Sequence, residues 1–212
     1  MKRSLLLVLT GLFISTLVLA QPERIAGGLS FATSKRFYAG ETGNPGYMLK
    51  TWVPVNKRRT MYVVPSVSVY NKLSYRNSSP SFISDSYMFQ ADLDFQMLVF
   101  HEKTLKIAAF AGANGTYIYQ HNYNPDGYVI DGLVLDTTDM GFGPNIGASL
   151  EMRMGAYWDF IVSAKYSGAG LRFGDRSLAD PEPFLTAPLG GPMIQVHAVY
   201  YFVSRGRAYS KR

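Results

Sequence analysis

Two carboxylates, Asp92 and Asp94, are the residues of this chain whose spacing most directly suggests chemistry. In an extended strand, residues two apart share a face, so these two side chains would lie next to each other. A pair of carboxylates can serve as acid and base or nucleophile in glycoside hydrolysis. That use requires a path for the sugar to both groups, and the elements that carry the pair decide whether such a path exists.

Other residues with catalytic or metal-binding chemistry are few. The chain has no cysteine, which excludes disulfides, thiol catalysis and cysteine-zinc sites. No nucleophile motif surrounds His197. Residues 121–139 contain four aspartates and neither lysine nor arginine, so this segment could hold a divalent cation, although its spacing matches no calcium-loop motif and a solvated loop is the simpler interpretation. The four are Asp126, Asp131, Asp136 and Asp139.

The carboxylate pair lies in residues 86–100, where apolar and polar residues alternate. A period of two predicts a strand with one apolar and one polar face. The pattern recurs along the chain and predicts eight strands, at residues 24–33, 47–55, 60–75, 86–100, 105–120, 140–153, 158–171 and 192–202. Pro65 removes a backbone donor from the third of these, so we expect a local irregularity there.

The predicted connections alternate between long and short. The long ones are residues 34–46, 76–85, 121–139 and 172–191, and the short ones are 56–59, 101–104 and 154–157. Beyond the first twenty residues no run is apolar enough for a membrane helix, so a chain that crosses a membrane must do so as a closed sheet. Short turns at one end and long loops at the other are typical of outer-membrane barrels. The sequence therefore predicts an all-β fold, an eight-stranded antiparallel up-and-down transmembrane β-barrel with short periplasmic turns, long extracellular loops and both termini periplasmic.

In such a barrel the polar columns face inward and fill the interior with charged side chains that must pair. The predicted lumen network comprises Arg24, Lys50, Asp92, Asp94, Glu151, Arg153, Asp159, Lys165 and His197. A salt-bridged plug is the simpler interpretation of this network, and a narrow ion or proton path is the alternative. Aromatic residues at the ends of the apolar columns predict two interfacial girdles, made of Tyr47, Tyr87, Phe100, Tyr117, Tyr119, Trp158, Tyr166, Tyr201 and Phe202.

The two ends of the chain differ from its middle. Residues 1–20 begin with Lys2 and Arg3 and continue with an apolar run, which predicts a secretory signal peptide cleaved near Ala20. Residues 21–202 form the barrel domain, and residues 203–212 form a basic periplasmic tail. Without Lys2 and Arg3, 19 basic residues stand against 15 acidic ones, too weak and dispersed an excess to indicate a nucleic-acid partner. The sequence indicates no cofactor and no metal.

In their pattern of strands, turns and aromatic bands, residues 24–202 resemble the small eight-stranded outer-membrane barrels of Gram-negative bacteria. The tyrosine-rich strands look most like those of Bacteroidota. The resemblance implies contact with outer-membrane lipids and lipopolysaccharide. One departure is that Phe202 is followed by ten further residues, whereas many relatives end on an aromatic residue. Some of these barrels modify lipid A with a histidine and a serine at the outer rim. Here only His121 lies at that end, His101 lies at a short turn, and no matching serine pattern is present.

The function that we predict is non-enzymatic, a structural or interaction role exercised through the outer loops. Three alternatives remain open. The first is an accessory subunit of a larger envelope complex, such as a secretion or gliding machine. The second is a narrow conduit for small solutes or hydrophobic molecules, and the third is a lipid A-modifying enzyme. A soluble lipocalin-like barrel would require the apolar columns to face inward instead.

Overall fold

The computed structural model describes residues 22–32, 46–78, 81–123, 136–168, 171–174 and 191–202. Within these ranges every regular element is a strand, and no helix is long and apolar enough to cross a membrane. The strands are β1 Arg24–Ala32, β2 Gly46–Pro54, β3 Met61–Ser78, β4 Ser81–His101, β5 Leu105–Tyr123, β6 Asp136–Arg153, β7 Trp158–Ser167, β8 Leu171–Gly174 and β9 Gly191–Tyr201.

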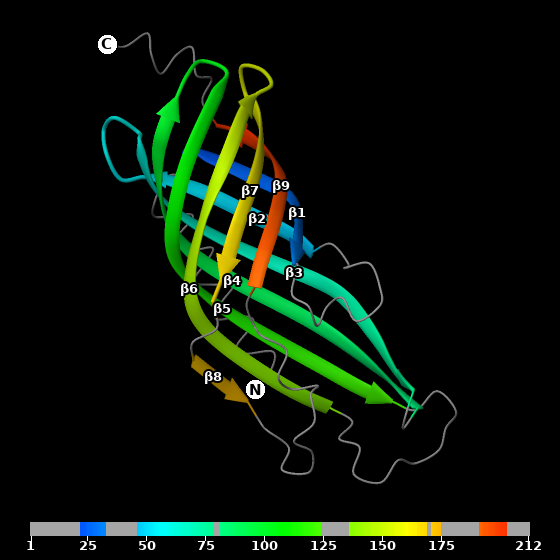
Figure 1. The fold of residues 1–212 in the computed structure, drawn as a ribbon. Coiled ribbons are helices and arrows are strands. Elements are labelled where there is room, and N and C mark those ends of the chain that lie inside the picture. Colours follow the sequence, from blue (N-terminus) through cyan, green and yellow to red (C-terminus); the bar gives the residue numbers. More distant parts are fainter. Residues whose placement is uncertain are drawn as a thin grey trace.

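The strands form one sheet that closes on itself. The order is β5-β4-β3-β2-β1-β9-β7-β6-β8, and a further pairing of β5 with β6 completes the circle. Every pairing is antiparallel. β8 pairs with β6 beyond the segment of β6 that pairs with β7, so β7 and β8 are two parts of the same wall position. The barrel is therefore eight-stranded, and the predicted fold class is confirmed (Figure 1).

The wall is taller on one side than on the other. β3, β4, β5 and β6 have 18, 21, 19 and 18 residues, whereas β1, β2, β7 and β9 have 9, 9, 10 and 11. Figure 1 shows the four long strands continuing past the ends of their neighbours. We call the end with the connections 55–60, 102–104 and 154–157 the turn end, and the opposite end the loop end.

The prediction of a long loop at residues 76–85 is wrong. β3 and β4 stay paired as far as Ser78 and Ser81, so this connection is the tip of an extended hairpin. Residues 121–139 likewise contribute strand residues, because β5 continues to Tyr123 and β6 begins at Asp136. These loop boundaries were misplaced for a physical reason. Backbone hydrogen bonds between strands do not require an apolar face, so a strand can continue past the point where its alternation of apolar and polar residues ends.

Pro65 interrupts the sheet on one side. It pairs in register with Leu93 of β4, but no β2–β3 pair forms at Pro65 or at Val64. Lys50–Ser66 and Val53–Val63 flank the interruption in one common register. The proline, which lacks a backbone N–H donor, therefore produces the expected irregularity as a gap in β2–β3 pairing. The register of the two strands is the same on both sides of the gap. The register shift of β3 against β4 lies farther along, between Tyr70 and Leu73.

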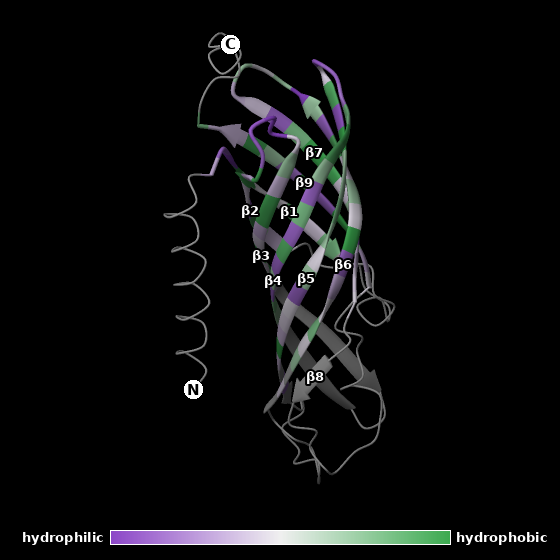
Figure 2. Ribbon diagram, turned by 90° about the vertical axis from the view of Figure 1, so that its left-hand side faces the viewer, coloured by the Kyte–Doolittle hydropathy of each residue, from purple (hydrophilic) through white to green (hydrophobic). Residues whose placement is uncertain are grey.

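The two faces of the wall are chemically opposite. Figure 2 shows hydrophobic and hydrophilic residues alternating along the strands. The apolar columns face outward and form a belt over the barrel; exposed members include Leu29, Leu49, Val69, Leu93, Phe95, Met97, Ile107, Phe142, Ile146, Leu150 and Ile194. A soluble barrel would bury these residues, so the lipocalin-like alternative is wrong. An encircling apolar belt on a closed sheet is instead typical of a barrel surrounded by lipid.

Candidate functional site

The polar columns bring charged residues from all parts of the chain into the barrel interior. Eight of the nine residues predicted for the lumen are buried: Arg24, Lys50, Asp92, Asp94, Glu151, Asp159, Lys165 and His197. Arg153 is not, which corrects that part of the prediction. It is the last residue of β6, where the wall ends, and its Nε donates to the carbonyl oxygen of Gly155 at 3.1 Å in the exposed turn.

At the turn end, buried charges gather around Glu151. We call this set of Arg24, Lys106, Glu151, Asp159 and Tyr201 the Glu151 cluster. Arg24 Nη1 donates to one carboxylate oxygen of Glu151 and Lys106 Nζ donates to the other. The Tyr201 hydroxyl lies 2.8 Å from Glu151 Oε1 and 2.8 Å from Asp159 Oδ2, so it can donate its single proton to either carboxylate. One tyrosine thus links the ion pairs to a second acid.

Aromatic rings complete the surroundings of Arg24. Its Cζ lies 4.4 Å from the ring centroid of Trp52, 5.1 Å from that of Tyr62 and 5.4 Å from that of Tyr201. Among the described residues, its Nε and Nη2 have no hydrogen-bond acceptor. The negative faces of aromatic rings attract a guanidinium. The rings therefore stabilise the part of this cation that the carboxylate does not reach.

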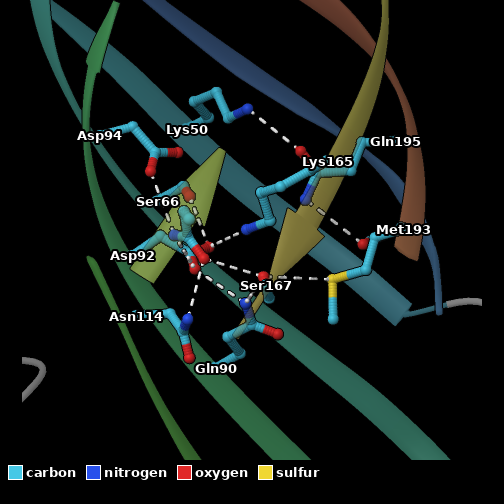
Figure 3. Close-up of polar contacts among 12 residues, drawn as sticks. Lys50, Ser66, Gln90, Asp92, Asp94, Asn114, Lys165, Ser167, Met193 and Gln195 are labelled. Carbon is cyan, nitrogen blue, oxygen red and sulfur yellow. Dashed lines mark hydrogen bonds and ion pairs between the residues drawn. The ribbon is translucent and has the colours of Figure 1, made fainter. Parts of the chain in front are cut away.

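Nearer the middle of the barrel, a second set of polar side chains surrounds Asp92 (Figure 3). We call Ser66, Gln90, Asp92, Asp94, Asn145, Lys165 and Ser167 the Asp92 cluster. Lys165 Nζ lies 2.9 Å from Asp92 Oδ2, and both side chains are buried. Gln90 Nε2 and Asn145 Nδ2 donate to Asp92 Oδ1 at 2.8 and 3.0 Å, and Ser66 Oγ donates to Oδ2 at 3.1 Å. Asp92 therefore has one cationic partner and three neutral ones.

Asn145 holds the two neighbouring carboxylates together. Its Nδ2 also donates to Asp94 Oδ1 at 3.1 Å, and its Oδ1 accepts from Asn114 Nδ2 and Ser167 Oγ, each at 2.9 Å. Asp92 and Asp94 are 5% and 3% exposed. A sugar substrate would have to displace these partners and enter a filled interior, so the geometry argues against a glycosidase pair.

A layer of aromatic and apolar side chains spans the interior near the turn end. Trp52, Val64, Ile161 and Val199 are each at most 1% exposed and belong to one contact cluster with Tyr62 and Tyr201. His197 lies against this layer, with its ring 6.0 Å from that of Trp52. Lys50 Nζ lies 5.9 Å from the Trp52 ring centroid and donates to Gln195 Oε1 at 3.2 Å. Val64 is two residues nearer the turn end than Ser66 of the Asp92 cluster, so this layer lies on the turn-end side of that cluster.

The outer rims carry the aromatic residues predicted for girdles, with one correction. Tyr47, Tyr87, Phe100, Trp158, Tyr166 and Phe202 are exposed, and Tyr117 and Tyr119 are partly exposed. Tyr201 is 3% exposed and belongs to the Glu151 cluster. Adjacent strand residues face opposite sides, so Tyr201 and Phe202 cannot share a face. Tyr200 takes the outward place, in ring contact with Tyr157, Trp158 and Phe202.

The sequence interpretation missed several interior residues. Lys106 lies on the polar face of its strand but was not included in the network, and Trp52, Gln90 and Asn145 were also missed. The two-residue alternation of a strand identifies all four, since each lies an even number of residues from another inward-facing residue of its strand. Among the side chains that the structure describes, no group of three histidine, aspartate or glutamate residues is arranged to hold a metal ion. The signal peptide, the basic tail, Asp126 and Asp131 lie outside the described residues.

The comparisons with known proteins show the fold alone. No protein-family model matches the chain, and no curated protein matches it either. Among solved structures, a major outer-membrane protein of Thermus thermophilus matches with a TM-score of 0.57 and 11% identity, covering 84% of this chain and 99% of that one. The fold is that of the eight-stranded outer-membrane β-barrels. The N-terminal β-barrel domain of OprF from Pseudomonas aeruginosa matches with a TM-score of 0.50 and 11% identity over 85% of this chain and 98% of that one. Neisserial surface protein A matches with a TM-score of 0.50 and 11% identity, covering 84% of this chain and 95% of that one.

Proposed function

We propose that this protein is a non-enzymatic, integral outer-membrane barrel that acts as a structural or interaction protein through its loop end. The observation that carries the proposal is the contrast between the two faces of the wall. Outside, an apolar belt needs lipid; inside, charged side chains are buried in ion pairs and hydrogen bonds. An eight-stranded barrel is just wide enough for its side chains to fill. This arrangement supports a plugged barrel whose contacts with other molecules lie at its ends.

We propose further that the turn end is periplasmic. β1 begins and β9 ends there, and the backbone N–H of Phe202 donates to the carbonyl oxygen of Glu23 at 3.3 Å. This end also carries the exposed basic turn Lys57, Arg58 and Arg59, in which Arg59 Nη1 lies 3.5 Å from Glu23 Oε1. Residues 203–212 follow β9 in the sequence, so we propose that this basic tail is periplasmic as well. In this orientation the loop end meets lipopolysaccharide, and the turn end is free to contact an envelope protein.

Different observations bear on the conduit, the lipid A-modifying enzyme and the accessory subunit. The buried layer of Trp52, Val64, Ile161 and Val199 opposes a conduit, because a water file would need these side chains to move. A lipid A-modifying enzyme needs a nucleophile beside a histidine at the outer rim, and the described side chains provide none there. The accessory-subunit alternative and the likeness to barrels of Bacteroidota remain proposals, supported by the basic turn and the tyrosine-rich strands respectively.

The test is a gel of the outer-membrane fraction in mild detergent, with and without boiling. A closed barrel should resist the detergent and change its mobility when boiled. A protein found in the soluble periplasmic fraction, without such a shift, would contradict the proposal.

A native gel of the same fraction separates the remaining roles. A lone small species supports a barrel that acts by itself through its loops. A heavy band that disappears on deleting residues 203–212 supports an accessory subunit of an envelope complex. Conductance across a planar bilayer by the purified wild-type protein would contradict the plugged interior.

A further inference from the structure

Four exposed basic side chains lie in two neighbouring turns at the turn end. Lys57, Arg58 and Arg59 are consecutive in the turn between β2 and β3, and Lys103 lies in the turn between β4 and β5. We call these four residues the basic rim. The connections 55–60 and 102–104 contain a single acidic residue, Glu102, so this part of the turn end is positively charged.

The turn between β2 and β3 has a fixed backbone. Asn56 Oδ1 accepts hydrogen bonds from the backbone N–H groups of Thr60 and Met61 at 2.9 and 3.2 Å. The backbone N–H of Arg59 donates to the carbonyl oxygen of Asn56 at 3.0 Å, and the Tyr62 hydroxyl donates to the carbonyl oxygen of Arg59 at 2.7 Å. These bonds hold the backbone that carries the three basic side chains in a defined conformation.

Arg59 occupies a backbone conformation that favours glycine. Its φ is 55°, and in the described part of the chain no other non-glycine residue has a positive φ. Glycine adopts such a φ at no steric cost, whereas a side chain there costs free energy. The hydrogen bonds of Arg59 within the turn use its backbone, so glycine could make them too.

The side chain of Arg59 has one weak contact within the protein. Its Nη1 lies 3.5 Å from Glu23 Oε1, and the side chain is 51% exposed. Exposed ion pairs contribute little to stability. The strained arginine is therefore better explained by a contact that its side chain makes outside the barrel.

The basic rim lies just beyond the apolar belt. Val55 and Phe100 are 56% and 41% exposed at the ends of their strands, and Met61 is partly exposed. Each residue of the basic rim lies within three residues of one of these apolar side chains. Three residues of extended chain span about 10 Å, and the headgroup layer on each side of a bilayer is about 5–7 Å thick. Long basic side chains can bend toward this layer, so its phosphates are within their reach.

An aromatic group elsewhere at the turn end marks the same level. Tyr157, Trp158, Tyr200 and Phe202 are exposed, and Tyr200 contacts the other three rings. Such rings are most stable at the level of the headgroups. Both the rings and the basic rim follow directly on the apolar belt. This depth favours lipid headgroups over a folded protein partner, which would lie farther from the belt.

We propose that the basic rim binds the phosphate groups of anionic phospholipids in the leaflet at the turn end. This proposal rests on the membrane position proposed above, in which that leaflet is the periplasmic one. Arg58 and Lys103 supply charge from two separate turns, and Arg59 accepts backbone strain to add a further charge. The preferred lipid has a net negative charge, such as phosphatidylglycerol, and a zwitterionic lipid with the same acyl chains binds more weakly.

The experiment is native mass spectrometry of the purified full-length protein in non-ionic detergent, titrated with dioleoylphosphatidylglycerol or dioleoylphosphatidylcholine. We expect the wild type to bind the first anionic lipid more tightly, by about fivefold or more. R58Q and K103Q should each weaken binding of the anionic lipid by about fivefold, which is the effect of one cation near an anionic lipid surface. The triple variant K57Q/R58Q/R59Q should lose the preference. All variants keep residues 203–212, so differences between them report on the turns.

R58K and E102Q are matched controls. R58K keeps the charge and should keep the preference, and E102Q removes a charge of opposite sign and should not weaken binding of the anionic lipid. Equal affinities of the wild type for the two lipids would overturn the proposal, as would a preference that the triple variant retains. Either result would leave the membrane proposal standing, because the boiling-dependent gel shift does not require an anionic lipid.

R59G separates a lipid contact from a structural role of Arg59. Glycine relieves the strained φ, so the urea midpoint should stay unchanged or rise, while binding of the anionic lipid weakens by about fivefold. A lower urea midpoint together with unchanged lipid binding would show that Arg59 serves the fold, and this would overturn its place in the basic rim.

Discussion

The two buried clusters solve the same problem with different chemistry. In the Glu151 cluster one carboxylate receives two cations directly, and the remaining surface of Arg24 is covered by aromatic rings. In the Asp92 cluster one lysine is joined by amides and a hydroxyl, so neutral donors complete the hydrogen bonding of the carboxylate. The neighbours thus determine how a buried charge is stabilised: rings at the turn end, amides at mid-barrel.

This difference predicts that removing one charged side chain lowers the free energy of unfolding by different amounts in the two clusters. Glu151 is the direct partner of two cations, so its removal leaves both without that carboxylate. Asp92 keeps three neutral donors if Lys165 is removed. Stability measurements on single substitutions can test the contrast, and Trp52 and Trp158 provide the fluorescence signal for unfolding.

The largest effect should come from E151Q. Breaking a buried ion pair from one side costs about 3–5 kcal/mol, because an uncompensated charge remains. Urea unfolding of the refolded barrel in lipid vesicles measures the loss. E102Q, at an exposed turn, should change the free energy of unfolding by about 0.5 kcal/mol or less. An E151Q barrel as stable as E102Q would show that the Glu151 cluster does not depend on its ion pairs.

K165M should cost less, about 3 kcal/mol, at the low end of the same range. Gln90, Asn145 and Ser66 still donate to Asp92 in this variant. The double variant K165M/D92N removes both charges and should be more stable than the sum of the single effects indicates. Strict additivity of the two substitutions, measured by the same urea unfolding, would contradict the assigned ion pair.

Y201F tests the hydroxyl that joins Glu151 to Asp159. Hydrogen bonds to charged groups contribute about 1.5–3 kcal/mol each. This variant removes the contacts of the hydroxyl with Glu151 and Asp159 and those that it accepts from Arg24 and Lys106, while keeping the ring beside Arg24. Y200F is the matched control, since Tyr200 faces outward. Equal unfolding curves for the two variants would place Tyr201 outside the network.

G28A against G27A tests the packing between the clusters. A Cβ on Gly28 would overlap the Val196 carbonyl oxygen and His197, whereas a Cβ on Gly27 meets nothing within 4 Å. Overpacking of this kind costs about 1–3 kcal/mol. We expect a lower urea midpoint for G28A and an unchanged or higher one for G27A. Equal midpoints would mean that the interior has spare room at His197.

The sequence was informative wherever one face of a strand meets lipid. Alternation located all eight wall positions, and it placed Asp92, Glu151 and Lys165 inside. It failed beyond the belt, where the β3–β4 hairpin continues through residues 76–85 without an apolar column. The prediction that Tyr201 belongs to a girdle was wrong for a reason that the sequence itself contains, because consecutive residues of a strand, such as Tyr201 and Phe202, face opposite sides.

The partners within each cluster were beyond the reach of the pattern. Arg24 and Glu151 come from β1 and β6, which are not neighbours in the sheet, and their contact across the lumen depends on how far the strands are staggered around the barrel. Periodicity gives the face of a residue but not its height relative to a distant strand. Arg153 shows the same limit, because parity alone does not indicate where the wall ends.

The seam between β1 and β9 has a consequence for how the barrel assembles. If β7 and β8 are counted as one wall position, the other pairings join strands that follow one another in the chain, whereas this one joins Arg24–Ala32 to Met193–Tyr201. Sequence-local hairpins form quickly, and contacts between distant segments form slowly. The seam is therefore the expected last step, and the Arg24–Glu151 contact forms with it. A bond made after the folding transition state slows unfolding without speeding folding. The Glu151 cluster would then lengthen the lifetime of the closed barrel by slowing its unfolding.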